Sequence, residues 1–169
     1  GLSRDNAAQH LFVMTLAFIG GFLMLGIIAD RLSQFFAVRP ISISVFGMTI
    51  FLFAQVTMIY GGFGSSLILV IMLGFFGTAS ILVYAGYAQI FPNNLSGRVS
   101  TMLNLLVFLG AFILQWGVGA VIQMWPATSS GYDPESYQAA IGVLVLLQAT
   151  GLIWYLISLK ISRKQSVLL

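Results

Sequence analysis

Five long apolar stretches, none with a charged residue in its middle, constrain this chain more than any other feature. A helix rises about 1.5 Å per residue, so about 20 apolar residues cross the roughly 30 Å of bilayer hydrocarbon. The stretches run from about 8 to 29, 41 to 60, 65 to 91, 99 to 125 and 138 to 160. They lack the alternation of barrel strands, and a bilayer offers no water to unpaired backbone groups. The sequence therefore predicts an all-α integral membrane protein, with residues 1–169 forming one bundle of five transmembrane helices.

The composition excludes most other classes of protein. Hydrophobic residues make up 59% of the chain and charged residues 7%, against about a quarter charged in an average soluble domain. Eleven charged side chains cannot coat a soluble surface, and nucleic-acid binding and disorder are excluded on the same ground. The absence of cysteine excludes disulfides, thiolate chemistry and cysteine-ligated zinc.

The predicted connections between the spans are short. Gly61, Gly62 and Gly64 mark a tight turn, and residues 92–94 (Pro-Asn-Asn) end the third span. In the longest loop, 126–137, the sequence Asp133-Pro134-Glu135 predicts an N-cap, a proline in the first helical position and an acidic first turn.

The basic residues predict the orientation in the membrane. If the spans alternate, one side receives Arg31, Arg39, Arg98, Lys160, Arg163 and Lys164, and the other receives only Arg4. Since Lys and Arg favour the cytoplasmic side, we expect the start outside and the C-terminus in the cytoplasm, in a plasma membrane such as the bacterial inner membrane. An odd number of spans with an outside start also suggests that further chain precedes Gly1.

Two motifs resemble the major facilitator superfamily of transporters. Residues 26–33 read Gly-Ile-Ile-Ala-Asp-Arg-Leu-Ser, and a glycine four residues before Asp-Arg resembles the superfamily's signature between the second and third helices of each half. Residues 92–100, with Asn104, Gln115 and Gly119 further on, resemble the stretch that joins its tenth and eleventh helices. The chain departs from the signature at 32–35, Leu-Ser-Gln-Phe, where a glycine and basic residues are usual.

This resemblance implies that the five spans match helices eight to twelve, within the six-helix C-terminal bundle of a secondary active transporter. The N-terminal half and helix seven would be missing partners. The fragment alone is then expected to be inactive and to self-associate, while the whole protein moves a small organic solute by alternating access. Nothing in the sequence identifies the solute, the coupling ion or the direction of transport.

A charged cluster is predicted on the cytoplasmic side. Asp30 is the only acid there, and Arg31 and Arg98 are its natural partners. The resemblance favours a role for these three residues in locking a cytoplasmic gate. The alternative is interfacial anchoring, with basic residues only setting the orientation.

The resemblance implies that the third and fourth spans border a central solute cavity, and both carry neutral polar residues. Asn104, Phe108, Ala111, Gln115 and Gly119 share one face of the fourth span, and Gly77, Ser80, Tyr84 and Tyr87 share one face of the third, with Gln89 nearby. The candidate cavity residues are Tyr84, Asn104, Gln115 and Trp116. The alternative is that these amides and hydroxyls only join helices to one another.

No catalytic or metal-binding arrangement is visible in the sequence, so we expect neither an enzyme nor a cofactor or metal ion. No ionisable residue lies in the middle of a span, which argues against a proton relay in this segment. His10, near the start of the first span, is expected to be an interfacial hydrogen-bonding residue. A non-transporting helical scaffold or assembly subunit is the alternative to a transporter.

Small residues are expected to let the helices approach closely. The positions are Ala17, Gly21, Gly47, Gly74, Gly77, Gly86, Gly110, Gly117 and Gly151.

Overall fold

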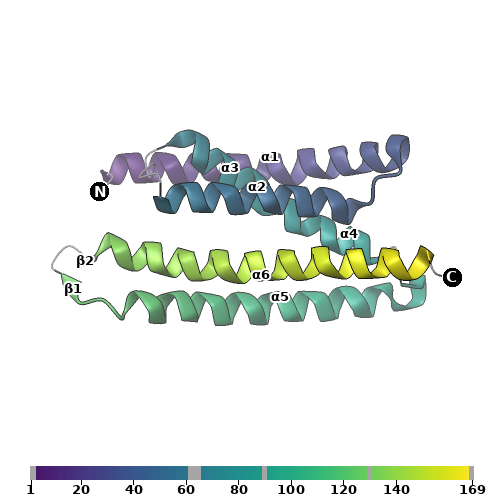
Figure 1. The fold of residues 1–169 in the computed structure, drawn as a ribbon. Coiled ribbons are helices and arrows are strands. Elements are labelled where there is room, and N and C mark those ends of the chain that lie inside the picture. The colour runs from purple at the N-terminus through teal and green to yellow at the C-terminus, as the bar shows by residue number, and fades with distance from the viewer. Residues whose placement is uncertain (1–2, 61–65, 89–90, 129–130, 168–169) are drawn as a thin grey trace. The chain divides into compact units, whose positions relative to one another are not determined.

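The computed structural model is helical apart from one small hairpin (Figure 1). It describes residues 3–60, 66–88, 91–128 and 131–167, so the predicted glycine turn at 61–64 and Gln89 lie outside the described residues. The elements are α1 (Arg4–Phe36), α2 (Pro40–Tyr60), α3 (Leu67–Gly77), the 3-10 helix η1 (Thr78–Ile81), α4 (Leu82–Ala88), α5 (Asn93–Ile122), β1 (Ala127–Thr128), β2 (Gly131–Tyr132) and α6 (Pro134–Val167).

Five helical segments in the described part of the chain are long and apolar enough to cross a membrane. They are Arg4–Phe36, Pro40–Tyr60, Leu67–Tyr84, Asn94–Ile122 and Pro134–Ile161. The prediction of an all-α chain with five helices long and apolar enough to cross a membrane is confirmed at this level.

α1 and α6 extend past both ends of the apolar stretches that predicted them, whereas α5 both begins and ends earlier than its stretch. α1 has 33 residues and measures about 50 Å, well over the thickness of the hydrocarbon. It passes residue 29, where the apolar stretch ends, and continues through Asp30 and Arg31 to Phe36. Hydropathy marks only what can lie in hydrocarbon, whereas a helix can continue through the interface with its polar side chains in water.

Local hydrogen bonds fix several helix ends. At the start of α1 the Ser3 side chain accepts a hydrogen bond from the Asn6 backbone N–H at 3.3 Å. At its end Ala37 takes a left-handed conformation, with φ of 52°. At α6 the predicted N-cap is confirmed, because the Glu135 N–H donates to Asp133 Oδ1 at 2.9 Å and Pro134 is the first helical residue.

The third span is not one continuous α-helix. α3 ends at Gly77 and the chain passes through one turn of 3-10 helix before α4 begins at Leu82. The Thr78 hydroxyl donates to the Phe75 carbonyl at 2.7 Å, three residues back. A 3-10 turn has about 3.0 residues per turn instead of 3.6, so it rotates the following residues relative to a straight helix.

The chain divides into two compact units, residues 1–116 and 117–169. In the second unit a two-stranded antiparallel hairpin precedes α6, with Ala127 opposite Tyr132 and Thr128 opposite Gly131. Gly131 has a φ of +116°, which a side chain would make costly. The expected single bundle over the whole chain stays a prediction.

Small residues bring α1 and α3 together in the first unit. A Cβ at Gly21 would overlap the Phe75 carbonyl oxygen and lie 2.6 Å from Thr78 Oγ1. A Cβ at Gly74 would lie 2.6 Å from the Met14 carbonyl oxygen and 3.0 Å from the Ala17 Cβ. Because residue numbers rise together along both helices, α1 and α3 run in the same direction. The pairs Ala17/Gly21 and Gly74/Thr78 form two small-x-x-x-small patterns that face each other.

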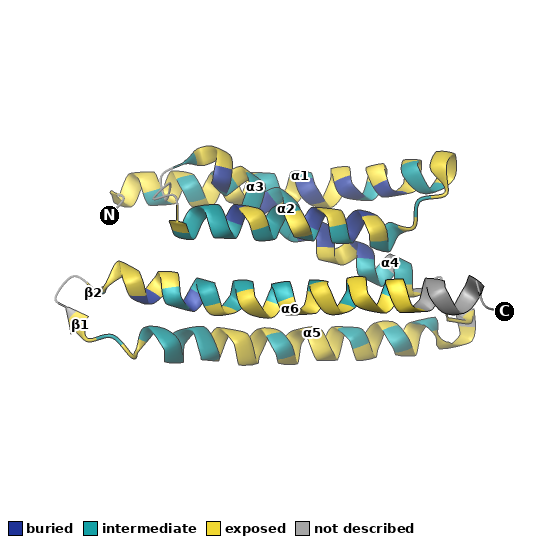
Figure 2. Cartoon of the chain, viewed as in Figure 1, coloured by how far each residue is buried: buried dark blue, intermediate teal, exposed yellow. Residues whose placement is uncertain are grey.

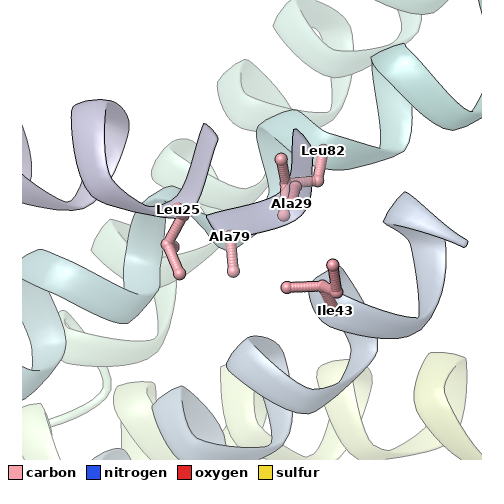
Figure 3. Close-up of a cluster of buried hydrophobic side chains, with 5 residues drawn as sticks. All are labelled: Leu25, Ala29, Ile43, Ala79 and Leu82. Atoms are coloured by element: carbon pink, nitrogen blue, oxygen red, sulfur yellow. The ribbon is translucent and has the colours of Figure 1, made fainter. Parts of the chain in front are cut away.

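A buried apolar cluster continues this contact toward the end of α1 (Figure 3). Its members are Leu25, Ala29, Ile43, Ala79 and Leu82, contributed by α1, α2, η1 and α4. The buried positions of the first unit gather where these helices meet (Figure 2). On α2, a Cβ at Gly47 would lie 2.6 Å from the Ala79 Cβ.

The packing role expected of small residues is confirmed on α1, α2 and α3 but not on α5 and α6. Gly77 and Gly86 lie in van der Waals range of Phe51 and Ile41. A Cβ at Gly110, Gly117 or Gly151 would meet nothing within 4 Å in the described structure. Sequence spacing alone does not separate these two groups, because both occur in apolar helices.

The neighbouring glycines Gly20 and Gly21 provide a matched test of the α1–α3 contact. We expect Gly21→Ala to lower the free energy of unfolding by about 1–3 kcal/mol, because the new methyl group overpacks the interface. Gly20 has open space around its Cβ position, so Gly20→Ala should leave stability unchanged or raise it by up to about 1 kcal/mol. Unfolding of the purified chain in mixed detergent micelles by added dodecyl sulfate, followed by circular dichroism, measures both. Equal effects of the two substitutions would contradict the close approach.

Candidate functional site

Two of the four predicted cavity residues meet in the structure. The Tyr84 hydroxyl donates to Asn104 Oδ1 at 3.2 Å, joining α4 to α5 across 20 positions of sequence. The Tyr84 side chain is half-buried and Asn104 is exposed. Both groups keep further hydrogen-bonding capacity, since a phenol oxygen can also accept and an amide nitrogen can donate twice. The pair is therefore a polar contact that retains unused donors and acceptors.

The other two candidates, Gln115 and Trp116, lie further along α5. Gln115 shares the face of α5 that carries Asn104, but the two residues are 11 positions apart, which is about 16 Å along the helix. Trp116 is the next residue and is 72% exposed. One small solute bound at the Tyr84–Asn104 pair would not reach Gln115, so the four candidates form two separate positions.

The predicted polar face of the third span is interrupted by η1. Gly77 packs against the Phe51 ring of α2, while Ser80 is exposed within η1 and Tyr87 is 37% exposed on α4. Tyr84 is the member of this set for which the described residues provide a hydrogen-bonded partner on another helix.

The predicted gate residues are exposed and do not pair in the described structure. Asp30 and Arg31 lie within α1, and Arg98 lies near the start of α5. Among the described residues no ion pair joins Asp30 to either arginine. Adjacent residues on a helix do not face each other, which disfavours pairing of Asp30 with Arg31. A gate contact between Asp30 and Arg98 stays a prediction.

His10 makes a local hydrogen bond within α1. Its Nδ1 lies 2.6 Å from the Asn6 carbonyl oxygen, one turn earlier on α1. A carbonyl oxygen only accepts, so Nδ1 carries the hydrogen in this contact. Within the described residues there is no cluster of three or more His, Asp or Glu side chains that could hold a metal ion.

The sequence did not indicate an apolar cavity that the structure contains. It has a volume of about 390 Å³ and lies among α1, α2 and α3. Its lining consists of Leu25, Ile28, Leu32, Val38, Ser42, Ile43, Phe46, Gly47, Phe75 and Phe76. Each of these residues is ordinary in a membrane helix, and only their assembly in three dimensions creates the cavity.

Two buried polar atoms on α2, the Ser44 hydroxyl and Gln55 Oε1, were also not predicted from the sequence. Ser44 is fully buried, and neither its hydroxyl nor Gln55 Oε1 has a hydrogen-bond partner among the described residues. The two residues are 11 positions apart and thus share one face of α2. A glutamine within an apolar span was an available signal for Gln55, whereas serine occurs too commonly in helices to indicate burial.

The Tyr84–Asn104 hydrogen bond can be measured with a double-mutant cycle. We expect Tyr84→Phe and Asn104→Ala each to destabilise the chain, with a coupling energy of about 0.5–1.5 kcal/mol, typical of one helix–helix hydrogen bond. Tyr87→Phe is the matched control, because it removes a hydroxyl from the same helix without a described partner. Thermal unfolding in detergent supplies the four free energies. A coupling near zero would show that the two side chains act independently.

Comparisons with known proteins do not place the chain in a family. A scan against protein-family models, a search of curated proteins and a search of solved structures each found no match. The resemblance to the major facilitator superfamily thus depends on the sequence motifs at 26–33 and 92–100 alone.

Proposed function

We propose that the chain is the C-terminal part of a secondary active transporter that moves a small organic solute by alternating access. The observation that carries the proposal is the Tyr84–Asn104 pair, a polar contact between two predominantly apolar spans. Polar side chains inside membrane helices are costly unless they bind each other, water or a solute. Unused donors and acceptors on this pair are available to a solute.

The interruption of the third span supports the same proposal. Secondary transporters bind their substrates where helices are discontinuous, near the middle of the bilayer. Here a turn of 3-10 helix lies three residues before Tyr84, within a span of apolar residues. A mid-helix 3-10 segment is frequently a hinge. The candidate solute site thus lies within one turn of the discontinuity in the span.

The chemistry of the site favours a solute recognised by hydrogen bonds and aromatic contact. Tyr84 and Asn104 are neutral, and no charged residue lies in the middle of any span. We infer that any proton coupling depends on residues in the N-terminal half of the whole protein. The start of this chain is proposed to lie outside and its C-terminus in the cytoplasm, from the asymmetry of Lys and Arg.

Single cysteines test the orientation cleanly, because the chain has none of its own. Gln34 and Gln123 are exposed residues near the ends of α1 and α5. We expect cysteine at Gln123 to react with a membrane-impermeant maleimide added outside intact cells, and cysteine at Gln34 to react only after permeabilisation. Reaction of both from the outside would contradict the alternating spans.

Asp30→Asn in the complete gene product tests the transport proposal. The proposed gate contact between Asp30 and Arg98 is charge-assisted, and such a pair contributes about 1.5–3 kcal/mol. Its loss should shift the gate equilibrium by about tenfold or more and lower solute uptake accordingly. Asp5→Asn removes the same charge at the other end of α1 and should leave uptake nearly unchanged. Vesicles that contain each variant are loaded from a mixture of small organic solutes, and uptake is measured by mass spectrometry.

A transporter and a non-transporting scaffold give different results in this uptake experiment. A scaffold or assembly subunit would give no saturable uptake in any variant, including the unaltered protein. Saturable uptake by the 169-residue chain alone would contradict the proposal that it is part of a larger carrier. Equal uptake by the Asp30 variant and the unaltered protein would reduce Asp30 to an interfacial anchor.

A further inference from the structure

Two arginines are the sequence neighbours of residues that line the apolar cavity among α1, α2 and α3. Leu32 and Val38, which line it, are joined because the Val38 N–H donates to the Leu32 carbonyl at 3.3 Å. Arg31 directly precedes Leu32 in the chain, and Arg39 directly follows Val38. Both arginines are exposed.

A second contact connects Arg39 to the cavity. The Ser42 N–H donates to the Arg39 carbonyl at 2.9 Å, in the turn where α2 begins. Ser42 is the only residue with a polar side chain among the described residues that line the cavity, and it is exposed. The backbone of Arg39 thus lies between Val38 and Ser42, two residues that line an otherwise apolar cavity, and its side chain is exposed.

The lining sets what can fill this space. Apart from the Ser42 hydroxyl, the side chains are aliphatic or aromatic, so a polar solute would lose its hydrogen bonds to water and gain almost none. At about 390 Å³ the cavity lies within the range of about 300–1,000 Å³ that is common for bound small molecules. In a membrane helix bundle, the abundant apolar molecules at this position are lipid acyl chains.

The positive charges of Arg31 and Arg39 favour lipids with an anionic headgroup. An acyl chain gains little by moving from other lipid tails into an apolar cavity, because both surroundings are apolar. Preference must then come from the headgroup. Arg31 and Arg39 exceed the single nearby acid, Asp30, by one positive charge, and Arg binds phosphate oxygens through paired N–H donors.

We propose that this cavity holds one acyl chain of an anionic phospholipid, whose phosphate binds Arg39 with help from Ser42 and Arg31. The lipid bridges the end of α1 and the beginning of α2, next to the buried cluster at Leu25, Ile43 and Ala79. The proposal depends on the chain lying in a membrane and is independent of transport. A scaffold with the same helices would bind the lipid equally well.

Photolabelling in vesicles tests the proposal. The purified chain is reconstituted in phosphatidylcholine with a trace of phosphatidylglycerol that carries a diazirine near the middle of one acyl chain. After illumination, labelled peptides are identified by mass spectrometry. We expect labelling to concentrate on peptides that contain Ile28, Phe46 or Phe75, and to exceed severalfold the labelling by a phosphatidylcholine probe with the same acyl chain.

Three variants separate the headgroup contribution from the cavity. Arg39→Gln should lower labelling by the anionic probe to the level of the neutral probe. Arg4→Gln removes the same charge at the opposite end of α1 and should not change it. Ser42→Phe places a ring at the exposed edge of the cavity and should lower labelling by both probes.

Several outcomes would overturn the proposal. Equal labelling by the two probes in the unaltered chain would remove the headgroup preference. Labelling spread over the exposed apolar surfaces of all helices would remove the site. Retention of anionic-probe labelling in Arg39→Gln, with the chain folded by circular dichroism, would show that Arg39 does not bind the phosphate.

Discussion

The close approach of α1 and α3 at Gly21 and Gly74 is the contact on which the first unit depends. Lipid tails are as apolar as leucine, so helices in a bilayer gain little by burying apolar surface against each other. Backbones must come close enough for many van der Waals contacts, which requires small residues. Further along α1, the larger side chains of Leu25, Ile28 and Leu32 line the apolar cavity. The close approach of α1 and α3 therefore occurs at the small residues that the two helices present to each other.

The sequence predicted the helices better than their ends. An uncharged apolar stretch of about 20 residues admits few structures in a bilayer, so all five spans were found. The ends differ because Asp30 and Arg31 stop an apolar stretch without stopping a helix, and α1 continues to Phe36. η1 was not predicted, because no proline marks it. The Thr78 hydroxyl donates to the Phe75 carbonyl, but threonines in continuous helices also donate to carbonyls three or four residues back, so this residue type does not indicate a 3-10 turn.

The candidate site was predictable only in part, for a geometrical reason. Helical spacing correctly places Asn104 and Gln115 on one face, but it does not say which residue of another helix lies opposite. The structure places Tyr84 opposite Asn104 and leaves Gln115 and Trp116 without a comparable contact in the described residues. The cavity beside Arg39 depends on three helices at once, so no single stretch of sequence contains its signal.

The third span joins the packed interior of the first unit both before and within the 3-10 turn. Before the turn, Gly74 is held against α1 by contacts that do not tolerate an added methyl group, and within it Thr78 meets Gly21 and Ala79 is fully buried. After it, Tyr84 is joined to α5 by a hydrogen bond between side chains that are not fully buried. Packed interfaces resist deformation. Since Ala79 of η1 and Leu82 of α4 belong to the buried cluster with α1 and α2, the 3-10 turn is held in place together with the α1–α3 contact, and the Tyr84–Asn104 hydrogen bond is the less constrained connection of the third span.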